Sequence, residues 1–330
     1  MRRRGWLAWL AAACSLAAAM PPASAQEAAW KPSRPIRLVV PFAAGGQPDL
    51  VARALVVPLA RELGEAVVVE NRPGAGGNIG TQSVALSPPD GHTLLLGTNG
   101  PLAVSPALDR KLAYDVERDL AFVTLVGTSI QLVVVPSSLK ESTLAEVITR
   151  ARQDPGKLNF ASVGKGSLSQ LTSQMIFGEA GVRAEHISFQ AGPAAVASLL
   201  AGDVQFLSLN PTALLPHLRG GRVRALAQTG ARRSARMPDL PTVAEALLPG
   251  FNELVWMVVA APAKTPPAAI RSLNAAFVKA IASPEIREKV WESQWIDPIG
   301  SSPEVARQFV LDEKRKWQRR GEERNVTLEE

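Results

Sequence analysis

Two glycine-containing turns could bind an anion. The first contains Gly45 and Gly46 and follows the apolar run 36–40; the second contains Gly164 and follows the run 158–162. Each turn leads into a segment with helical periodicity. A strand that turns sharply into a helix directs backbone N–H groups and the positive end of the helix dipole toward one point. Two such turns, far apart in the chain, predict two half-sites that close on one small anionic molecule.

The residue types needed for catalysis or metal binding do not occur in suitable patterns. His92, His186 and His217 have no second metal ligand three or four residues away. There is no Gly-x-Ser-x-Gly motif, and no base neighbours Ser167 or Ser169 in the sequence. We therefore expect a protein that is not an enzyme and that holds no metal. An exported hydrolase is the alternative, which a turnover screen with small esters, amides and phosphates would detect.

The N-terminus has the features of a secretory signal. Arg2, Arg3 and Arg4 precede an apolar run that is too short to span a bilayer, and an Ala-x-Ala site ends at Ala25. We expect cleavage after Ala25 and a periplasmic protein. An uncleaved anchor and a lipoprotein modified at Cys14 are the alternatives. N-terminal sequencing of the exported protein should begin at Gln26, and lipid on Cys14 would contradict this interpretation.

Composition excludes several other classes. Cys14 is the only cysteine, so the mature chain has no disulfide and no cysteine nucleophile. The net charge of +6 includes the three leader arginines, and the remaining +3 gives no reason to expect nucleic acid as a partner. The glycine-rich segment 74–80 has Ile79 where a dinucleotide fingerprint needs glycine, so no nucleotide cofactor is expected. The remaining 305 residues are enough for two lobes.

Strand-like and helix-like segments alternate along the chain. The expected strands are 36–40, 66–70, 93–96, 122–126, 132–135, 204–207 and 224–228. The expected helices are 50–63, 79–86, 144–153, 168–180, 193–201, 242–247, 268–282, 284–294 and 303–320. This alternation predicts an α/β fold with mainly parallel sheets.

Longer motifs run along the whole mature chain. They include PIRLVVPF at 35–42, VVVENRPGAGGNIG at 67–80, PDGHTLLLG at 89–97, PGKLNFAS at 155–162 and LPTVAE at 240–245. Together they resemble the Bug, or TctC-type, periplasmic solute receptors of tripartite tricarboxylate transporters. The resemblance implies a type II-like two-lobed periplasmic binding protein fold. In that fold, each lobe is a sheet flanked by helices, and a small carboxylate binds in the cleft between the lobes. It also implies delivery of the ligand to a membrane permease.

The resemblance also implies which residues contact the ligand. Transferred position by position, with two departures from the family pattern included, they are Phe42, Gly45, Gly46, Gln47, Asp49, Asn99, Gly100, Ser162, Gly164, Ser167, Gln190 and Asn210. Asp49 is expected to cap a helix and hold the first loop, since its charge would repel an anion.

Three departures from the family pattern bear on the ligand. Gln47 and Pro48 replace the usual Gly-Thr or Gly-Ser, which exchanges a hydroxyl for an amide. Gln190 stands where the family has lysine, and Leu209 where it has aspartate. The missing carboxylate favours a ligand without an ammonium group. Which carboxylate binds is left open by the sequence.

The resemblance divides the chain into lobes. Lobe one is expected to comprise 29–128 plus 250–330, and lobe two 129–249, with boundaries good to roughly five residues. We expect a monomer. A ligand sensor for a membrane signalling partner would share this fold and cleft, so the sequence leaves that alternative open; neighbouring genes would separate the two.

Overall fold

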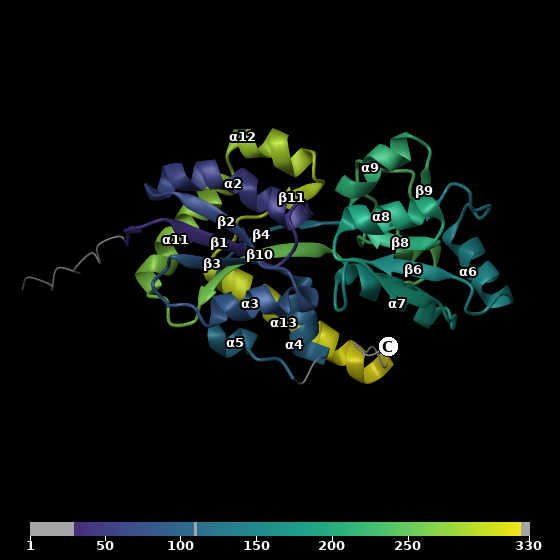
Figure 1. Cartoon of the computed structure of the whole chain (residues 1–330), viewed down its shortest axis with the longest axis horizontal. Helices are drawn as coiled ribbons and strands as arrows, with labels where there is room; N and C mark the ends of the chain where they lie inside the picture. The colour runs from purple at the N-terminus through teal and green to yellow at the C-terminus, as the bar shows by residue number, and fades with distance from the viewer. Residues whose placement is uncertain (1–29, 109–110, 325–330) are drawn as a thin grey trace, which may run out of the picture.

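The computed structural model describes residues 30–108 and 111–324, whose strands form two sheets side by side (Figure 1). The expected signal peptide, 1–25, lies outside the described residues. The first sheet has the order β11–β4–β10–β3–β1–β2, with β1 Ile36–Val40, β2 Val67–Asn71, β3 Thr93–Thr98, β4 Leu120–Ser129, β10 Val255–Pro262 and β11 Ile296–Pro298. The second has the order β7–β6–β8–β5–β9, with β5 Leu132–Pro136, β6 Asn159–Ser162, β7 Glu185–Ser188, β8 Phe206–Leu209 and β9 Val223–Gln228.

Helices cover both faces of each sheet, which confirms the expected two-lobed α/β fold (Figure 1). Those of lobe one are α2 Gln47–Leu63, η1 Ala75–Gly77, α3 Asn78–Ala85, η2 Gly100–Val104, α4 Ser105–Leu108, α5 Val116–Asp119, α11 Pro267–Ile281, α12 Pro284–Ile286, η3 Arg287–Glu292 and α13 Pro303–Arg324. Those of lobe two are α6 Leu144–Gln153, α7 Leu168–Glu179, α8 Gly192–Ala201, α9 Pro211–Arg219 and α10 Val243–Ala246. No helix in these ranges is long and apolar enough to cross a bilayer.

Both sheets are mixed: most strands of each sheet share one direction, as expected, but β10 and β11 in the first and β5 in the second run against it. In the first, β1 is parallel to β2 and β3, whereas β10 is antiparallel to β3 and β4. In the second, β6 is parallel to β7 and β8, whereas β5 is antiparallel to β8 and β9. The cause is the path between lobes. The chain enters lobe two along β5 and returns to lobe one along β10, so these strands run away from the cleft.

The parallel strands run in the opposite sense, with their carboxyl ends at the cleft. A helical segment begins just after each of them: α2 follows β1, η2 follows β3, α7 follows β6, α8 follows β7 and α9 follows β8. Ligands of open α/β sheets bind outside the carboxyl ends of the strands. The topology therefore brings several helix N-termini, from both lobes, to the same edge.

A buried carboxylate joins the second crossing between lobes to the C-terminal helix. Glu253 precedes β10, its side chain is fully buried, and its backbone N–H donates to the Thr229 carbonyl. Its carboxylate forms ion pairs with Lys316, at 3.2 Å, and with Arg320, both on α13. Because a buried charge requires a partner, α13 fixes the position of the crossing.

Replacing Glu253 with Gln should lower the free energy of unfolding by about 2–4 kcal/mol, since both cations would lose their buried counter-charge. Urea denaturation measures this. Glu117→Gln is the matched control, because Glu117 pairs with Lys314 of the same helix but is exposed; it should cost less than about 1 kcal/mol. Equal losses for the two variants would show that the buried charge of Glu253 does not fix the crossing.

Candidate ligand-binding site

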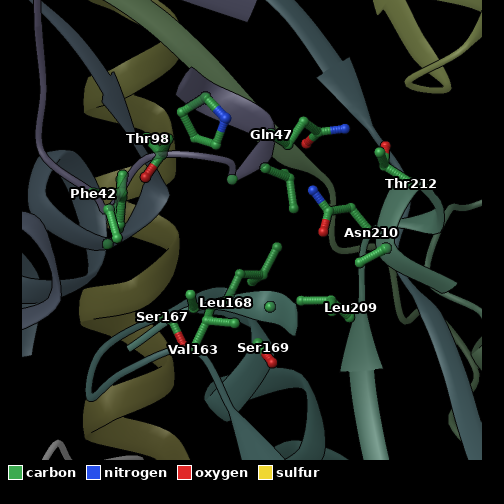
Figure 2. A pocket seen from close by; sticks show the side chains of 18 of the residues that line it. Phe42, Gln47, Thr98, Val163, Ser167, Leu168, Ser169, Leu209, Asn210 and Thr212 are labelled. Atoms are coloured by element: carbon green, nitrogen blue, oxygen red, sulfur yellow. The ribbon is translucent and has the colours of Figure 1, made fainter. Parts of the chain in front are cut away.

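A cavity of about 310 Å³ lies between the two lobes (Figure 2). Lobe one contributes the loop after β1, the start of α2 and the end of β3. Lobe two contributes the starts of α7, α8 and α9. Its volume is at the small end of the range for ligand pockets, about 300–1,000 Å³. The site has room for a small metabolite.

Four α-helices of the described chain begin at this cavity. Their N-cap residues, which all line it, are Gly46 of α2, Ser167 of α7, Ala191 of α8 and Asn210 of α9. Only Ser167 among these caps makes a side-chain hydrogen bond to its own helix. The first backbone N–H groups of a helix have no partner within it. Four positive helix ends with free donors therefore surround the space.

The described cavity lining includes no Asp, Glu, Lys, Arg or His. Much of the wall is apolar, from Phe42, Val163, Leu168, Leu209 and Val255. A bound anion would thus meet partial charges of helix ends rather than a full cationic side chain. Elsewhere in the described residues, no group of three or more His, Cys, Asp or Glu side chains could hold a metal ion.

The structure brings nine of the twelve expected site residues to the cavity. They are Phe42, Gly45, Gly46, Gln47, Asn99, Gly100, Ser167, Gln190 and Asn210. Figure 2 shows the Asn210 amide extending into the space. Three residues, Asp49, Ser162 and Gly164, are not part of the lining and support the loops instead.

Asp49 holds the first loop from within α2. Its carboxylate accepts hydrogen bonds from the Gly45 N–H at 2.9 Å, from Arg53 at 3.0 Å and from Asn71 at 2.9 Å. Asn71 also donates to the Phe42 carbonyl. Burial raises the pKa of Asp49, but these hydrogen bonds outweigh it and leave the pKa below its ordinary value. The charged form of Asp49 therefore fixes Gly45 beside the cavity.

Ser162 and Gly164 shape the second loop. The Ser162 hydroxyl accepts from the Gly164 N–H at 3.2 Å and lies 2.7 Å from Nε2 of His186. The φ of Gly164 is +124°, a conformation that a side chain would strain. At the end of this loop, Ser167 caps α7 by accepting from the Gln170 N–H. The loop thus delivers the start of α7 to the cavity.

The side-chain nitrogens of Gln47 and Asn99 already donate hydrogen bonds. Nε2 of Gln47 donates to the Gln294 carbonyl at 3.0 Å. Nδ2 of Asn99 donates to the Leu254 carbonyl, and its Oδ1 accepts from the Trp256 N–H. Asn99 therefore links β3 to β10, and Gln47 links α2 to the turn before β11. These residues line the cavity while fixing its walls.

The lobes touch on either side of the cavity. On one side, a Cβ on Gly76 of lobe one would clash with the Lys165 carbonyl of lobe two. On the other, the Thr212 hydroxyl donates to Oε1 of Gln294 at 2.8 Å. The space is therefore narrowed from both sides by contacts that cross from lobe to lobe.

Several residues that line the cavity were not expected from the sequence: Thr98, Gln131, Val163, Leu168, Val255 and Thr212. Gln131 is a lone polar residue directly before the apolar run 132–135, and Thr98 ends the apolar run of β3. For these two residues, the sequence signal for a place at the cavity was a polar residue at one end of a buried strand. Nothing local in the sequence sets apart Val255, which begins a strand that was not expected.

Two α/β lobes around a cavity at the starts of several helices define a two-lobed binding protein. The family can be stated from sequence: the chain belongs to the tripartite tricarboxylate transporter receptor family, whose model matches residues 51–326. The resemblance noted from the motifs is thus confirmed. The family model describes a receptor, and one structure similar to this chain is the periplasmic binding protein BugD, with a TM-score of 0.83 and 29% identity over 90% of this chain and 99% of that one.

Individual relatives cover most of the chain. Protein BugT from Bordetella pertussis is 37% identical over 87% of this chain and 88% of its own. A structure from R. palustris with adipate has a TM-score of 0.84 and 31% identity, covering 90% of this chain and 99% of that one. MatC from Rhodopseudomonas palustris, with bound malate, has a TM-score of 0.81 and 31% identity over 87% and 99% of the two chains.

Replacing Asp49 with Asn should lower the free energy of unfolding at pH 7 by about 2 kcal/mol, because the charge-assisted hydrogen bonds to Gly45 and Arg53 are lost. The lowered pKa of Asp49 stabilises the fold above the unfolded value of about 3.9, and this contribution is lost as the pH falls through the folded value. The difference between parent and variant should therefore shrink below about pH 4.

Chemical denaturation across the pH range measures this difference. Asp312→Asn is the control, because Asp312 also pairs with an arginine but is exposed on α13; it should change stability little. A stability loss for Asp49→Asn that persists at low pH would show that its charge does not hold the loop.

Proposed function

We propose that this chain captures a small carboxylate without an ammonium group between its lobes and delivers it to a membrane permease of the tripartite tricarboxylate transporter type. The observation that carries this proposal is the set of four helix N-termini around a cavity without charged side chains. The protein would act in the periplasm as a monomer, after cleavage behind Ala25.

Electrostatics favours an anion at this position. An anion at a helix N-terminus gains about 0.3–1 kcal/mol at an exposed site and up to about 2 kcal/mol where it is partly buried. A ligand ammonium would face the same positive ends, and the cavity lining offers no carboxylate to pair with it. The apolar wall around Phe42 and Leu168 suits the carbon skeleton of such an anion.

The relatives support the same ligand class. The R. palustris protein similar to this chain binds adipate, and MatC binds malate. Both ligands are dicarboxylates without nitrogen, as the uncharged lining favours here. The two proteins bind different carboxylates, so proteins that share this fold differ in their particular ligand.

We also propose that binding closes the lobes, with 29–128 plus 250–330 moving against 129–249. The contacts from Gly76 to Lys165 and from Thr212 to Gln294 would form on closure. Arg236 of lobe two, 3.6 Å from the Asp297 carboxylate of lobe one, would add to them. Hinge closure around a ligand is a common motion of binding proteins.

A panel of small carboxylates, including adipate and malate, tests the proposal by calorimetry, with amino acids as the contrasting set. We expect at least one carboxylate without nitrogen to bind more tightly than every amino acid tested. Ligand at saturation should reduce the radius of gyration in X-ray scattering. Tightest binding to an amino acid would overturn the ligand class, and an unchanged radius would overturn closure.

For the bound carboxylate, Gly46→Val should weaken affinity at least tenfold, or ~1.4 kcal/mol, because it adds bulk at the first turn. The fold should survive, since φ of Gly46 is −75° and a Cβ there meets its nearest atom at 3.6 Å. Gly178→Val, at an open position near the far end of α7, is the control. Parent-like binding by folded Gly46→Val would place the ligand elsewhere.

A further inference from the structure

Gln131 lies at the first crossing between lobes and lines the cavity. It sits between the end of β4 at Ser129 and the start of β5 at Leu132, and only 3% of the residue is exposed. It was not among the residues expected from the sequence. Its place in the fold is at the cleft end of both sheets, where the two lobes meet.

The backbone of Gln131 is held by one neighbouring residue. Its N–H donates to the Thr229 hydroxyl at 2.9 Å, and its carbonyl accepts from the Thr229 N–H at 3.1 Å. Thr229 itself is fully buried. This pair of hydrogen bonds ties the first crossing to the second, so Gln131 has a fixed starting point for its side chain.

The side-chain oxygen of Gln131 is also fixed. Oε1 accepts hydrogen bonds from the Thr172 hydroxyl of α7 and from the Ser208 hydroxyl of β8, both at 3.0 Å. Both partners are fully buried. With Oε1 beside these two hydroxyls, Nε2 lies on the opposite side of the amide.

The side-chain nitrogen is in a different situation. Nε2 of Gln131 has no hydrogen-bond partner in the described part of the chain, although it carries two N–H donors. Nε2 keeps some accessible surface, so its donors reach the space that Gln131 lines. Because Oε1 is directed to Thr172 and Ser208, the open donors remain on the side of the cavity that Gln131 lines.

We infer that Gln131 is a specificity-determining residue, whose amide donates to an oxygen of the ligand at the hinge side of the cavity. This inference rests on the proposed carboxylate-binding function. A neutral amide N–H donates a hydrogen bond to a carboxylate, carbonyl or hydroxyl oxygen. It cannot pair with an ammonium group, which has no acceptor. The Gln131 amide therefore adds to the preference of the helix ends for an anion over an ammonium group, and it needs no cationic side chain to do so.

Two of the other amides near the site differ in this respect. The nitrogens of Gln47 and Asn99 already donate to backbone carbonyls. Asn210 extends into the cavity from the start of α9, far along the chain from the crossings (Figure 2). Gln131 thus combines a hydrogen-bonded oxygen, nearly complete burial and open donors. Its position at the crossing also places the ligand contact where the lobes move against each other.

Two variants of Gln131 test this inference, with adipate and malate as the probes in calorimetry. Gln131→Met keeps the length of the side chain but removes the donors, so affinity for the bound probe should fall about tenfold. Gln131→Glu keeps an acceptor for Thr172 and Ser208 but turns a carboxylate toward the anion. We expect a loss of at least about 100-fold at pH 7.5, because like charges repel strongly where water is excluded.

The pH dependence separates a ligand contact from a structural role. Lowering the pH from 7.5 to 5 should recover part of the affinity of Gln131→Glu relative to the parent, because a protonated carboxyl again donates a hydrogen bond. A residue that only supported the crossing would show no such recovery. Circular dichroism and thermal melting establish that each variant is folded.

Gln228→Met is the matched control. Gln228 is fully buried in β9 beside Leu132, but its Nε2 donates to the Met237 and Leu240 carbonyls and its Oε1 accepts from the Ser234 N–H. This variant should lower the melting temperature and leave the probe affinity within about twofold of the parent.

The outcomes separate this inference from the proposed function. If the parent binds a probe and folded Gln131→Met binds it equally well, the inference is wrong while the proposed function stands. The same conclusion follows if Gln131→Glu binds like the parent at pH 7.5. If the parent binds neither these probes nor any other carboxylate of the panel, the proposed function is wrong, and this inference is wrong with it.

Discussion

The orientation of the parallel strands is the constraint on which the site depends. β1, β6, β7 and β8 all direct their carboxyl ends to the cleft, so the helices that follow them must begin there. Each helix brings unpaired N–H groups and a positive dipole end to the cavity. The anion site is thus a consequence of chain direction, and the side chains mainly determine its shape and its selectivity.

Holding these helix ends in place requires charges outside the cavity. Asp49 is buried beneath the first loop and hydrogen-bonds to Gly45, while its partner Arg53 balances it from the next turn of α2. Glu253 plays a comparable part for the second crossing through α13. Charged groups therefore support the walls and the crossings, and the described lining itself is neutral.

Local sequence predicted the elements with strong periodic patterns and missed those defined by long-range pairing. The expected strand 36–40 agrees with β1, and the expected helix 50–63 lies within α2. β10 was not expected, although Val255–Pro262 is apolar, because a continuous apolar run alone does not distinguish a strand from a buried helix. The antiparallel strands within the sheets were missed for the same reason, since strand direction depends on where the chain crosses between lobes.

The site shows a similar division. Glycine turns have a local signal, because a backbone that must adopt a positive φ, as at Gly45, needs glycine. Gln131 has only a weak local signal, as a polar residue before an apolar run, because its role depends on hydroxyls 41 and 77 residues away. Its open amide at the crossing and the helix ends on both lobes share one property: they are neutral donors. A site of this kind binds an anion through neutral donors rather than through an ion pair. No ion pair has to be broken when the lobes separate, so the ligand can be released again.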